Sequence, residues 1–148
     1  MQSTTPHRAT DDRTFEDLDR TACIKLLCSK RVGRVAVVVD DASPLVVPVN
    51  YTLDEETVIF RTGPGSKLAG LRTQPISFQV DDHDPYRHTG WSVLVRGVAF
   101  EFEAGDVVED PAPWAPGEKP HWVQVIPMEI TGRRVLWSGP AVDARGYL

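Results

Sequence analysis

The stretch VGRVAVVVDDASPLVVPVNYTLDEETVIFRT, from Val32 to Thr62, determines the fold class. It contains three runs rich in β-branched residues, and the segments DDASP and LDEE separate them. β-Branched side chains favour extended strands, whereas clusters of Asp, Ser and Pro favour turns. The pattern therefore predicts three successive strands, over residues 32–39, 45–52 and 57–62.

The same alternation of β-branched runs and turn segments continues toward the C-terminus. Further strands are predicted over residues 76–80, 91–103 and 122–126, and TGRRVLWS is expected to continue the last one after a break. A short amphipathic helix is predicted to begin at an N-cap, Asp19, and to end before Gly33, and GSKLAGLR predicts a second helical turn or two. Six strands with two short helices predict a mainly β fold, a small antiparallel β-barrel with helices packed outside.

Length and composition are those of one globular domain. The chain has 148 residues, 41% of them hydrophobic and 25% charged. The domain is predicted over residues 15–138, with a disordered tail at residues 1–14 and a C-terminal tail at residues 139–148. A formal charge of −5 argues against nucleic-acid binding, because such proteins neutralise phosphates with basic residues. No apolar run has the length of a bilayer span, so a cytoplasmic protein without a membrane partner is expected.

The segment FRTGPGSKLAGLR, Phe60 to Arg72, has residue types that suit a phosphorylated ligand. Ser66 and Lys67 offer a hydroxyl and an ammonium group at a helix start, where anions are favoured. Arg61 and Thr62, at the end of the preceding strand, are positioned to converge on the same spot. The segment is not a GxxxxGK[ST] loop, because no Ser or Thr follows the lysine. The alternative is a capped helix in which Ser66 is only the N-cap.

The segment VVPVNY, Val46 to Tyr51, carries a proline inside an apolar run. Pro48 cannot donate a hydrogen bond to a neighbouring strand, so a planar ligand rather than a strand is a candidate neighbour. Asn50 can donate and accept hydrogen bonds, and Tyr51 adds a ring and a hydroxyl. An ordinary edge strand is the alternative.

The segment DDHDPYRH, Asp81 to His88, has the density of carboxylates and imidazoles of a zinc or manganese site. The same composition describes a solvated connection between two strands. No second motif completes a coordination set, so no metal is expected. The chain also lacks GxSxG, HExxH and CxxC, and no catalytic residue is assigned.

Seven segments follow one another in a recognisable order: VGRVAVV, PVNYTLD, VIFRTGPGSKLAGLR, ISFQVDD, GWSVLVRGVAFEF, PW and ITGRR. From about Leu18 to Arg134, they resemble the pyridoxamine 5′-phosphate oxidase-like family of flavin-binding split barrels, particularly its actinobacterial and nitroimidazole-resistance-like branches. The resemblance implies a six-stranded antiparallel split β-barrel with short flanking helices. It also implies a homodimer, with one FMN in each of two grooves between the subunits.

The resemblance further implies which residues hold the FMN. The family's phosphate contacts correspond to Arg61, Thr62, Ser66 and Lys67. Its isoalloxazine ring lies along Val47, Pro48, Val49, Asn50 and Tyr51, and is approached by Trp91 and Ser92. A ring at this place would account for the proline in the strand.

The chain departs from true pyridoxamine-phosphate oxidases at SGPAVDARGYL, which has no basic, aromatic segment for a substrate phosphate. Vitamin B6 oxidation is therefore not expected. The resemblance instead implies a flavin-dependent oxidoreductase. Such an enzyme passes hydride from a reduced nicotinamide to a small electrophile, a nitro compound or quinone, and the cofactor carries the chemistry.

Two alternatives keep the fold and change the function. The deazaflavin coenzyme F-420 has an oligoglutamate tail that needs a basic groove, for which Arg31, Arg34, Arg133 and Arg134 are candidates. A storage or sensor protein that holds flavin or haem without turnover also fits a chain with no assigned acid or base. Spacing and composition do not separate these alternatives.

Overall fold

The computed structural model describes residues 13–40, 42–69, 71–105 and 109–137. The two predicted tails lie outside these ranges, apart from Arg13 and Thr14, which belong to the first strand. No helix of the described part is long and apolar enough to cross a membrane.

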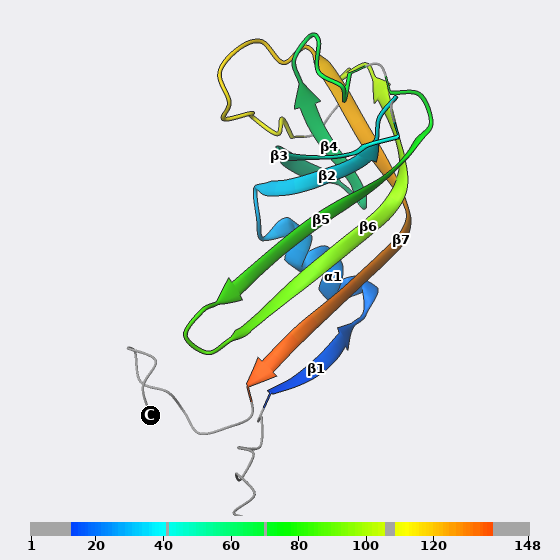
Figure 1. The fold of residues 1–148 in the computed structure, drawn as a ribbon. Helices are drawn as coiled ribbons and strands as arrows, with labels where there is room; N and C mark the ends of the chain where they lie inside the picture. The colour runs from blue at the N-terminus through cyan, green and yellow to red at the C-terminus, as the bar shows by residue number, and fades with distance from the viewer. Residues whose placement is uncertain (1–12, 41, 70, 106–108, 138–148) are drawn as a thin grey trace, which may run out of the picture.

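Within the described residues the chain forms seven strands and one helix (Figure 1). In chain order they are β1 (Arg13–Leu18), α1 (Arg20–Cys28), β2 (Val32–Val38), β3 (Pro44–Asp54), β4 (Thr57–Thr62), β5 (Gln74–Asp84), β6 (Thr89–Phe102) and β7 (His121–Trp137). All strand pairs are antiparallel. The prediction of a mainly β, antiparallel fold is therefore confirmed.

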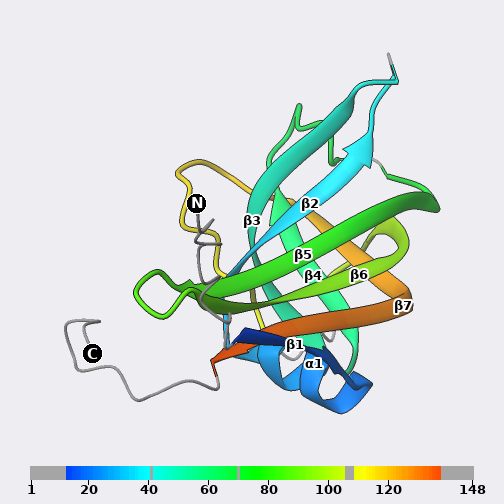
Figure 2. The same cartoon turned by 60° about the horizontal axis from the view of Figure 1, so that its bottom comes forward.

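Six of the strands close into a ring. The sheet runs in the order β1-β7-β4-β3-β2-β5-β6, and β6 also pairs with β7. Strands β2 to β7 therefore surround a common interior, and β1 is added on the edge of β7 (Figure 2). The length of β7 makes this possible, because its 17 residues contact β4 at one end and β1 at the other.

Three local expectations differ from the structure. β1 was not expected, because RTFEDL has mostly exposed, polar side chains and little apolar patterning. The expected break in β7 is absent, since Pro127 sits at a register shift between β6 and β7 and the strand continues. Within GSKLAGLR, residues 66–69 form only a tight turn, closed by the Ala69 N–H on the Ser66 carbonyl oxygen (3.0 Å), and the described residues include no second helix.

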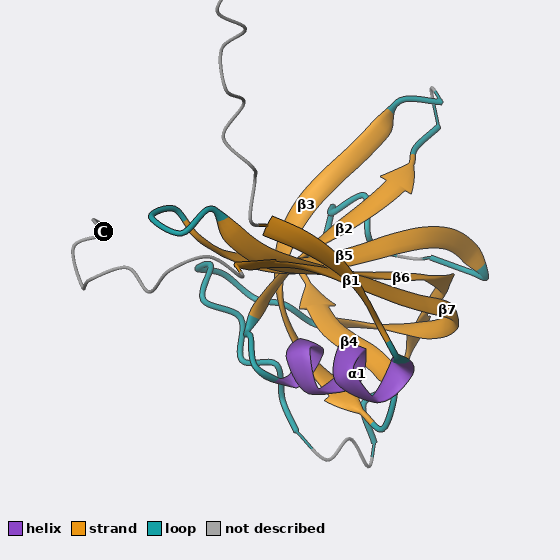
Figure 3. Cartoon of the chain, turned by 90° about the horizontal axis from the view of Figure 1, so that it is seen from below, coloured by secondary structure: helices purple, strands orange, loops and turns teal. Residues whose placement is uncertain are grey.

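The core fills the ring, and α1 packs against one part of it. Alternate residues of β2, β5 and β6 are buried, as expected for strands with one face toward a core, whereas Val58, Ile59 and Phe60 of β4 are buried in succession. The helix contacts β3, β6 and β7, and Figure 3 shows it lying beneath the strands in that view. Cys23 and Leu27 are fully buried on its inner side, and the Asp19 carboxylate accepts the Ala22 N–H (2.8 Å) as an N-cap. Gly33 does not end this helix; it lies inside β2.

Candidate functional site

The β3 residues expected along a flavin ring do not share one face. Val47, Val49 and Tyr51 point toward the core, and the Tyr51 hydroxyl donates to a backbone carbonyl oxygen of α1. Burial raises the pKa of Tyr51. Pro48 and Asn50 alternate with these inward-facing residues, so they are the β3 side chains in this segment that face a ligand on the outside of the ring.

One edge of β3 is open along the segment that contains Pro48. Residues 44–50 pair with β2 on one side, whereas β4 pairs only with residues 51–54 on the other. Among the described residues, no strand pairs with that second edge at residues 44–50. Pro48 therefore lies in an edge segment, and both sequence interpretations of this proline, edge strand and ligand contact, agree with the pairing.

A proline-rich loop lies against β3 and β4. This loop, residues 109–120, is called the connector because it leads from β6 to β7. The backbone N–H of Trp114 donates to the Asn50 side-chain oxygen (2.8 Å), and the Thr52 hydroxyl donates to the Glu109 carbonyl oxygen (3.2 Å). Two β3 side chains thus hold the connector in place. Asn50, expected to contact the ligand, binds the connector through its amide oxygen.

Arg61 on β4 is held by the same connector. Its Nη1 donates to both carboxylate oxygens of Asp110 (3.1 and 3.0 Å), and its Nε donates to the Lys119 carbonyl oxygen (3.0 Å). Its guanidinium carbon lies 4.9 Å from the ring centre of Trp122. The Ala112 N–H, together with Arg61, lowers the pKa of Asp110 below its ordinary value, so the carboxylate is charged at neutral pH.

The turn after β4 presents Lys67. Ser66 accepts the Leu68 N–H through its hydroxyl oxygen (3.1 Å), so it does cap the turn, as the alternative interpretation expected. Lys67 is exposed, and no carboxylate of the described residues forms an ion pair with it. Thr62 is 7% exposed and belongs to the inner face. Lys67 is therefore a cation of this turn that is open to an anion.

Trp91 and Ser92 lie far from this turn in the same chain. Phe102, at the other end of β6, is opposite Trp122, and Trp122 is opposite Arg61. Eleven residues of strand separate Trp91 from Phe102, about 35 Å at the rise of a β-strand. Figure 1 shows the β5–β6 hairpin at the bottom and the end of β4 at the top. Arg61 and the turn after β4 therefore lie at the opposite end of β6 from Trp91 and Ser92, whereas the predicted residues of β3 lie across β2 and β5 from Ser92.

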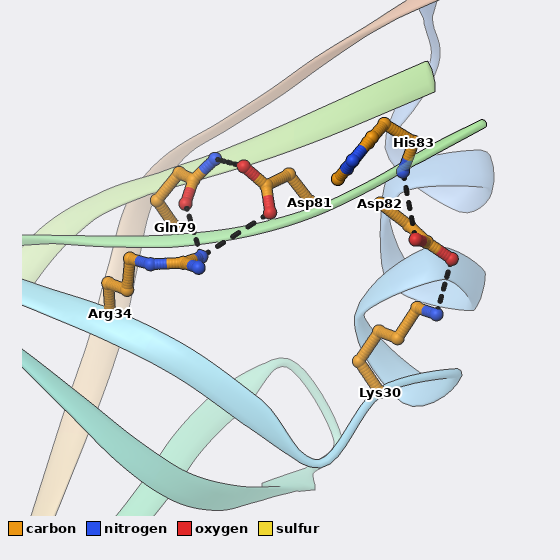
Figure 4. Close-up of polar contacts among 6 residues, drawn as sticks. All are labelled: Lys30, Arg34, Gln79, Asp81, Asp82 and His83. Carbon is orange, nitrogen blue, oxygen red and sulfur yellow. Dashed lines mark hydrogen bonds and ion pairs between the residues drawn. The ribbon is translucent and has the colours of Figure 1, made fainter. Parts of the chain in front are cut away.

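The acidic segment at the end of β5 does not form a metal site. Figure 4 shows Asp81 and Asp82 on opposite faces of the strand. Asp81 accepts from Arg34 (3.3 Å), whereas Asp82 accepts from Lys30 (2.5 Å) and from the His83 N–H (2.8 Å). No group of three or more His, Cys, Asp or Glu side chains able to hold a metal ion occurs in the described part. The expected connection between two strands is limited to residues 85–88, because Asp81 to Asp84 belong to β5 and pair with β6.

The arginines considered for a deazaflavin tail are all paired with carboxylates. Their partners are Glu109 for Arg31, Asp81 for Arg34, Asp17 for Arg133 and Glu16 for Arg134, at 3.1–3.9 Å. Arg133 and Arg134 are consecutive in β7, so their side chains leave opposite faces of the strand. These arginines do not form one basic groove in this chain.

Comparison with known proteins identifies the family. The family model described as pyridoxamine 5′-phosphate oxidase matches residues 19–134. The chain belongs to this family. Among relatives of the pyridoxamine 5′-phosphate oxidase family, the uncharacterized protein Rv0080 of Mycobacterium tuberculosis is 33% identical over 140 residues, which cover 84% of this chain and 88% of that protein.

Two solved structures from the comparison are described as FAD-binding proteins. The one from Mycobacterium smegmatis is 37% identical, with a TM-score of 0.63, over 82% of this chain and 98% of that chain. The one from Mesorhizobium loti is 25% identical, with a TM-score of 0.66, over 84% of this chain and 98% of that chain. A nitroimidazole-resistance-like protein from Bacteroides thetaiotaomicron shares the fold at 15% identity, with a TM-score of 0.64.

The donor set around the turn fits a flavin phosphate only in part. A phosphate requires cationic or N–H donors, and the exposed ammonium of Lys67 supplies one. Arg72, at the end of the same segment, is exposed and lines a cavity of about 610 Å³ with Trp122 and Phe102. Arg61 is already engaged by Asp110. The cationic group that remains for a phosphate is therefore Lys67, with Arg72 nearby in sequence.

The sequence did not identify Asp110 or Arg72 as site residues. Arg72 closes the segment from which Lys67 was chosen, and its charge was the available signal. Asp110 lies 49 residues from its partner Arg61, and the sequence around it, EDPAP, predicts a loop without indicating what the loop contacts.

Proposed function

We propose that this protein binds a flavin in a groove between two copies of the chain. The observation that carries the proposal is the similarity, over nearly the full length of the relatives, to two FAD-binding proteins. The division of the predicted site residues supports the second copy. About 35 Å of strand separates Trp91 from Phe102, at the end of β6 nearest Arg61, so we infer that a Trp91 close to a flavin bound at the turn after β4 comes from another subunit.

The outer face of the ring offers a surface for that second copy. Three large apolar side chains are exposed there: Val38 (56%), Val46 (60%) and Met128 (77%). They flank a groove of about 760 Å³, lined by Ala36, Val38, Pro44, Pro75 and Met128 among others. The groove is also lined by Ser77 and by the ion pair of Arg96 with Glu129, and this mixture of apolar and charged side chains is typical of protein–protein interfaces. We therefore propose a homodimer formed through this face, with the flavin at the subunit interface.

Met128→Arg tests the homodimer. A charged side chain in the middle of an apolar interface is desolvated without a partner, so the variant is expected to sediment as a monomer at micromolar concentration and to lose bound flavin. Phe15→Arg, on β1, is the matched control, because Phe15 is 72% exposed and lies outside this face. A Met128→Arg protein that remains dimeric and yellow would contradict the interface.

The proposed activity is that of a flavin-dependent oxidoreductase. A bound flavin supplies hydride transfer at its ring. The chain holds the cofactor phosphate with Lys67 and presents Pro48 and the open edge of β3 to the ring. The acids that contact the β3–β4 region, Glu109 and Asp110, are paired with arginines. This arrangement favours transfer of hydride from a reduced nicotinamide to a nitro compound or quinone, with the accompanying proton taken from solvent.

Spectroscopy of the purified protein tests this function. Protein prepared without added cofactor is expected to show flavin absorbance, and that absorbance to bleach with NADH or NADPH and return on addition of a nitroaromatic compound or quinone. FMN and FAD share the ring and the first phosphate, and extraction followed by chromatography distinguishes them. If only the reduced deazaflavin coenzyme bleaches the flavin, then that coenzyme, and not a nicotinamide, is the electron donor. Bound flavin that no donor reduces would leave storage as the function, and absence of any flavin would overturn the proposal.

A further inference from the structure

The connector packs on the outer face of β3 and β4. Val58 and Phe60 belong to the core, so Ile59 between them points outward, as does its pairing partner Thr52. Both outward residues are nevertheless buried, with exposed fractions of 2% for Ile59 and 6% for Thr52. The Thr52 hydroxyl donates to the Glu109 carbonyl oxygen (3.2 Å), so the connector lies over this part of the outer face. The connector is therefore a packed layer of the fold.

One arginine fixes both ends of this layer. Arg61 binds the Asp110 carboxylate near the start of the connector and the Lys119 carbonyl oxygen near its end. A single planar guanidinium thus closes the connector into a compact loop. The middle of the loop is tethered separately, because the Trp114 N–H donates to the Asn50 side-chain oxygen (2.8 Å). These contacts together determine where residue 114 lies.

The tether at Asn50 places Trp114 where the open edge of β3 begins. β4 pairs with β3 from Tyr51 onward, and residues 44–50 form the segment whose second edge pairs with no strand among the described residues. Asn50 is the last residue of that segment and lies about 7 Å along the strand from Pro48. The Trp114 residue is 72% exposed, so its indole is not part of the core of its own chain. A large apolar side chain on a fixed backbone therefore stands beside the place where a flavin ring is expected.

We propose that the indole of Trp114 packs against the flavin ring, and that Asn50 is a positioning residue that holds Trp114 there through its backbone. The proposal rests on the proposed flavin site. An indole suits the contact because flat aromatic rings attract one another in offset-stacked or edge-to-face arrangements. The ring is common to riboflavin, FMN and FAD, so this contact is independent of the phosphate that Lys67 is expected to hold.

Trp114→Ala tests the contact with the ring. Apoprotein is titrated with riboflavin, FMN and FAD by calorimetry, and the variant is expected to bind all three about five-fold or more weakly than the wild type. Trp114→Phe keeps a flat ring and is expected to recover most of the lost affinity. Glu118→Ala, at an exposed position of the same connector, is the control and is expected to bind all three flavins as the wild type does. Because Trp114 is exposed, its variants are expected to keep the Tm of the wild type, which separates a loss of affinity from a loss of fold.

The double variant Asn50→Ala/Trp114→Ala tests the positioning role. Asn50→Ala removes the acceptor of the Trp114 N–H and is expected to weaken riboflavin binding in the wild-type background. The same substitution is expected to add little once the indole is absent, because it acts through that side chain. Additive effects of the two substitutions would mean that Asn50 contacts the flavin itself, and would overturn its positioning role.

Riboflavin separates failure of this proposal from failure of the flavin site. An unchanged riboflavin affinity in Trp114→Ala would overturn the ring contact, while flavin binding by the wild type would leave the proposed function intact. A Trp114→Ala protein that sediments as a monomer, beside a dimeric wild type, would assign the indole to the subunit interface and would also overturn the ring contact. A wild type that binds none of the three flavins would overturn the proposed function itself.

Discussion

Lys67→Ala is expected to weaken binding of FMN and FAD by about 1.5–3 kcal/mol, the contribution of a hydrogen bond to a charged group. The structure gives a reason to choose this residue over Arg61. Lys67 is exposed on the turn after β4, and no carboxylate of the described residues pairs with it, whereas Arg61 is engaged by Asp110. In Lys67→Ala the phosphate therefore loses a charged donor, and Arg61 does not replace it because Arg61 is engaged by Asp110.

Riboflavin and a second lysine provide the controls for this experiment. Riboflavin lacks the phosphate, so its dissociation constant is expected to be the same for the wild type and for Lys67→Ala. Lys25→Ala removes the same charge from an exposed position on α1 and is expected to leave all three flavins unaffected. Equal affinity of wild type and Lys67→Ala for FAD would show that the turn is only a capped connection, as the Ser66 hydrogen bond to the Leu68 N–H allows.

Gly97→Ala is expected to lower the free energy of unfolding by about 3 kcal/mol, the upper part of the range for overpacking a well-packed core. A Cβ atom at this position would lie 2.1 Å from the Ile126 carbonyl oxygen and 3.2 Å from the Pro127 Cα. Both are backbone atoms of β7, so a side-chain rotation cannot relieve the contact. The site also carries the register shift between β6 and β7, where the strands approach with altered pairing.

Thermal unfolding measures this effect. For a chain of this size a loss of about 3 kcal/mol corresponds to a decrease in Tm of roughly 6–12 °C. Gly105→Ala is the matched control, because nothing lies within 4 Å of the Cβ position there, and its Tm is expected to stay close to that of the wild type. A Gly97→Ala protein with an unchanged Tm would mean that the β6–β7 pair moves apart at little cost.

The strands were predictable where the sequence carries strong local signals. Residues 57–62 were expected as a strand and form β4 with those bounds, because β-branched residues fill the segment and acidic turns precede it. β1 was missed, because its polar sequence becomes a strand only through pairing with β7, whose residues lie more than 100 positions away. Propensity is a local property and does not report such a partner.

The candidate site shows the same limit. The residue types of the turn after β4 and the proline of β3 pointed to a ligand, and the family they resemble was confirmed. The contact between Arg61 and Asp110 depends on the folded position of an irregular loop, and the loop sequence has no periodicity that would predict this contact. The burial of Tyr51 also follows from strand register, which one strand read alone does not fix.

The position of β7 in the sheet has a consequence for how the chain is made. β4 ends at residue 62, but one of its two partner strands is the first part of β7. β1 pairs with the last part of β7, which ends at Trp137, so β1 has no partner strand until that part has been synthesised. At a synthesis rate of about 5–20 residues per second, the 75 residues between residues 62 and 137 take roughly 4–15 s to appear. During that time the nascent chain has unpaired strand edges on both β1 and β4, so early contact with a chaperone at the ribosome is expected to limit aggregation more than any increase in local strand propensity.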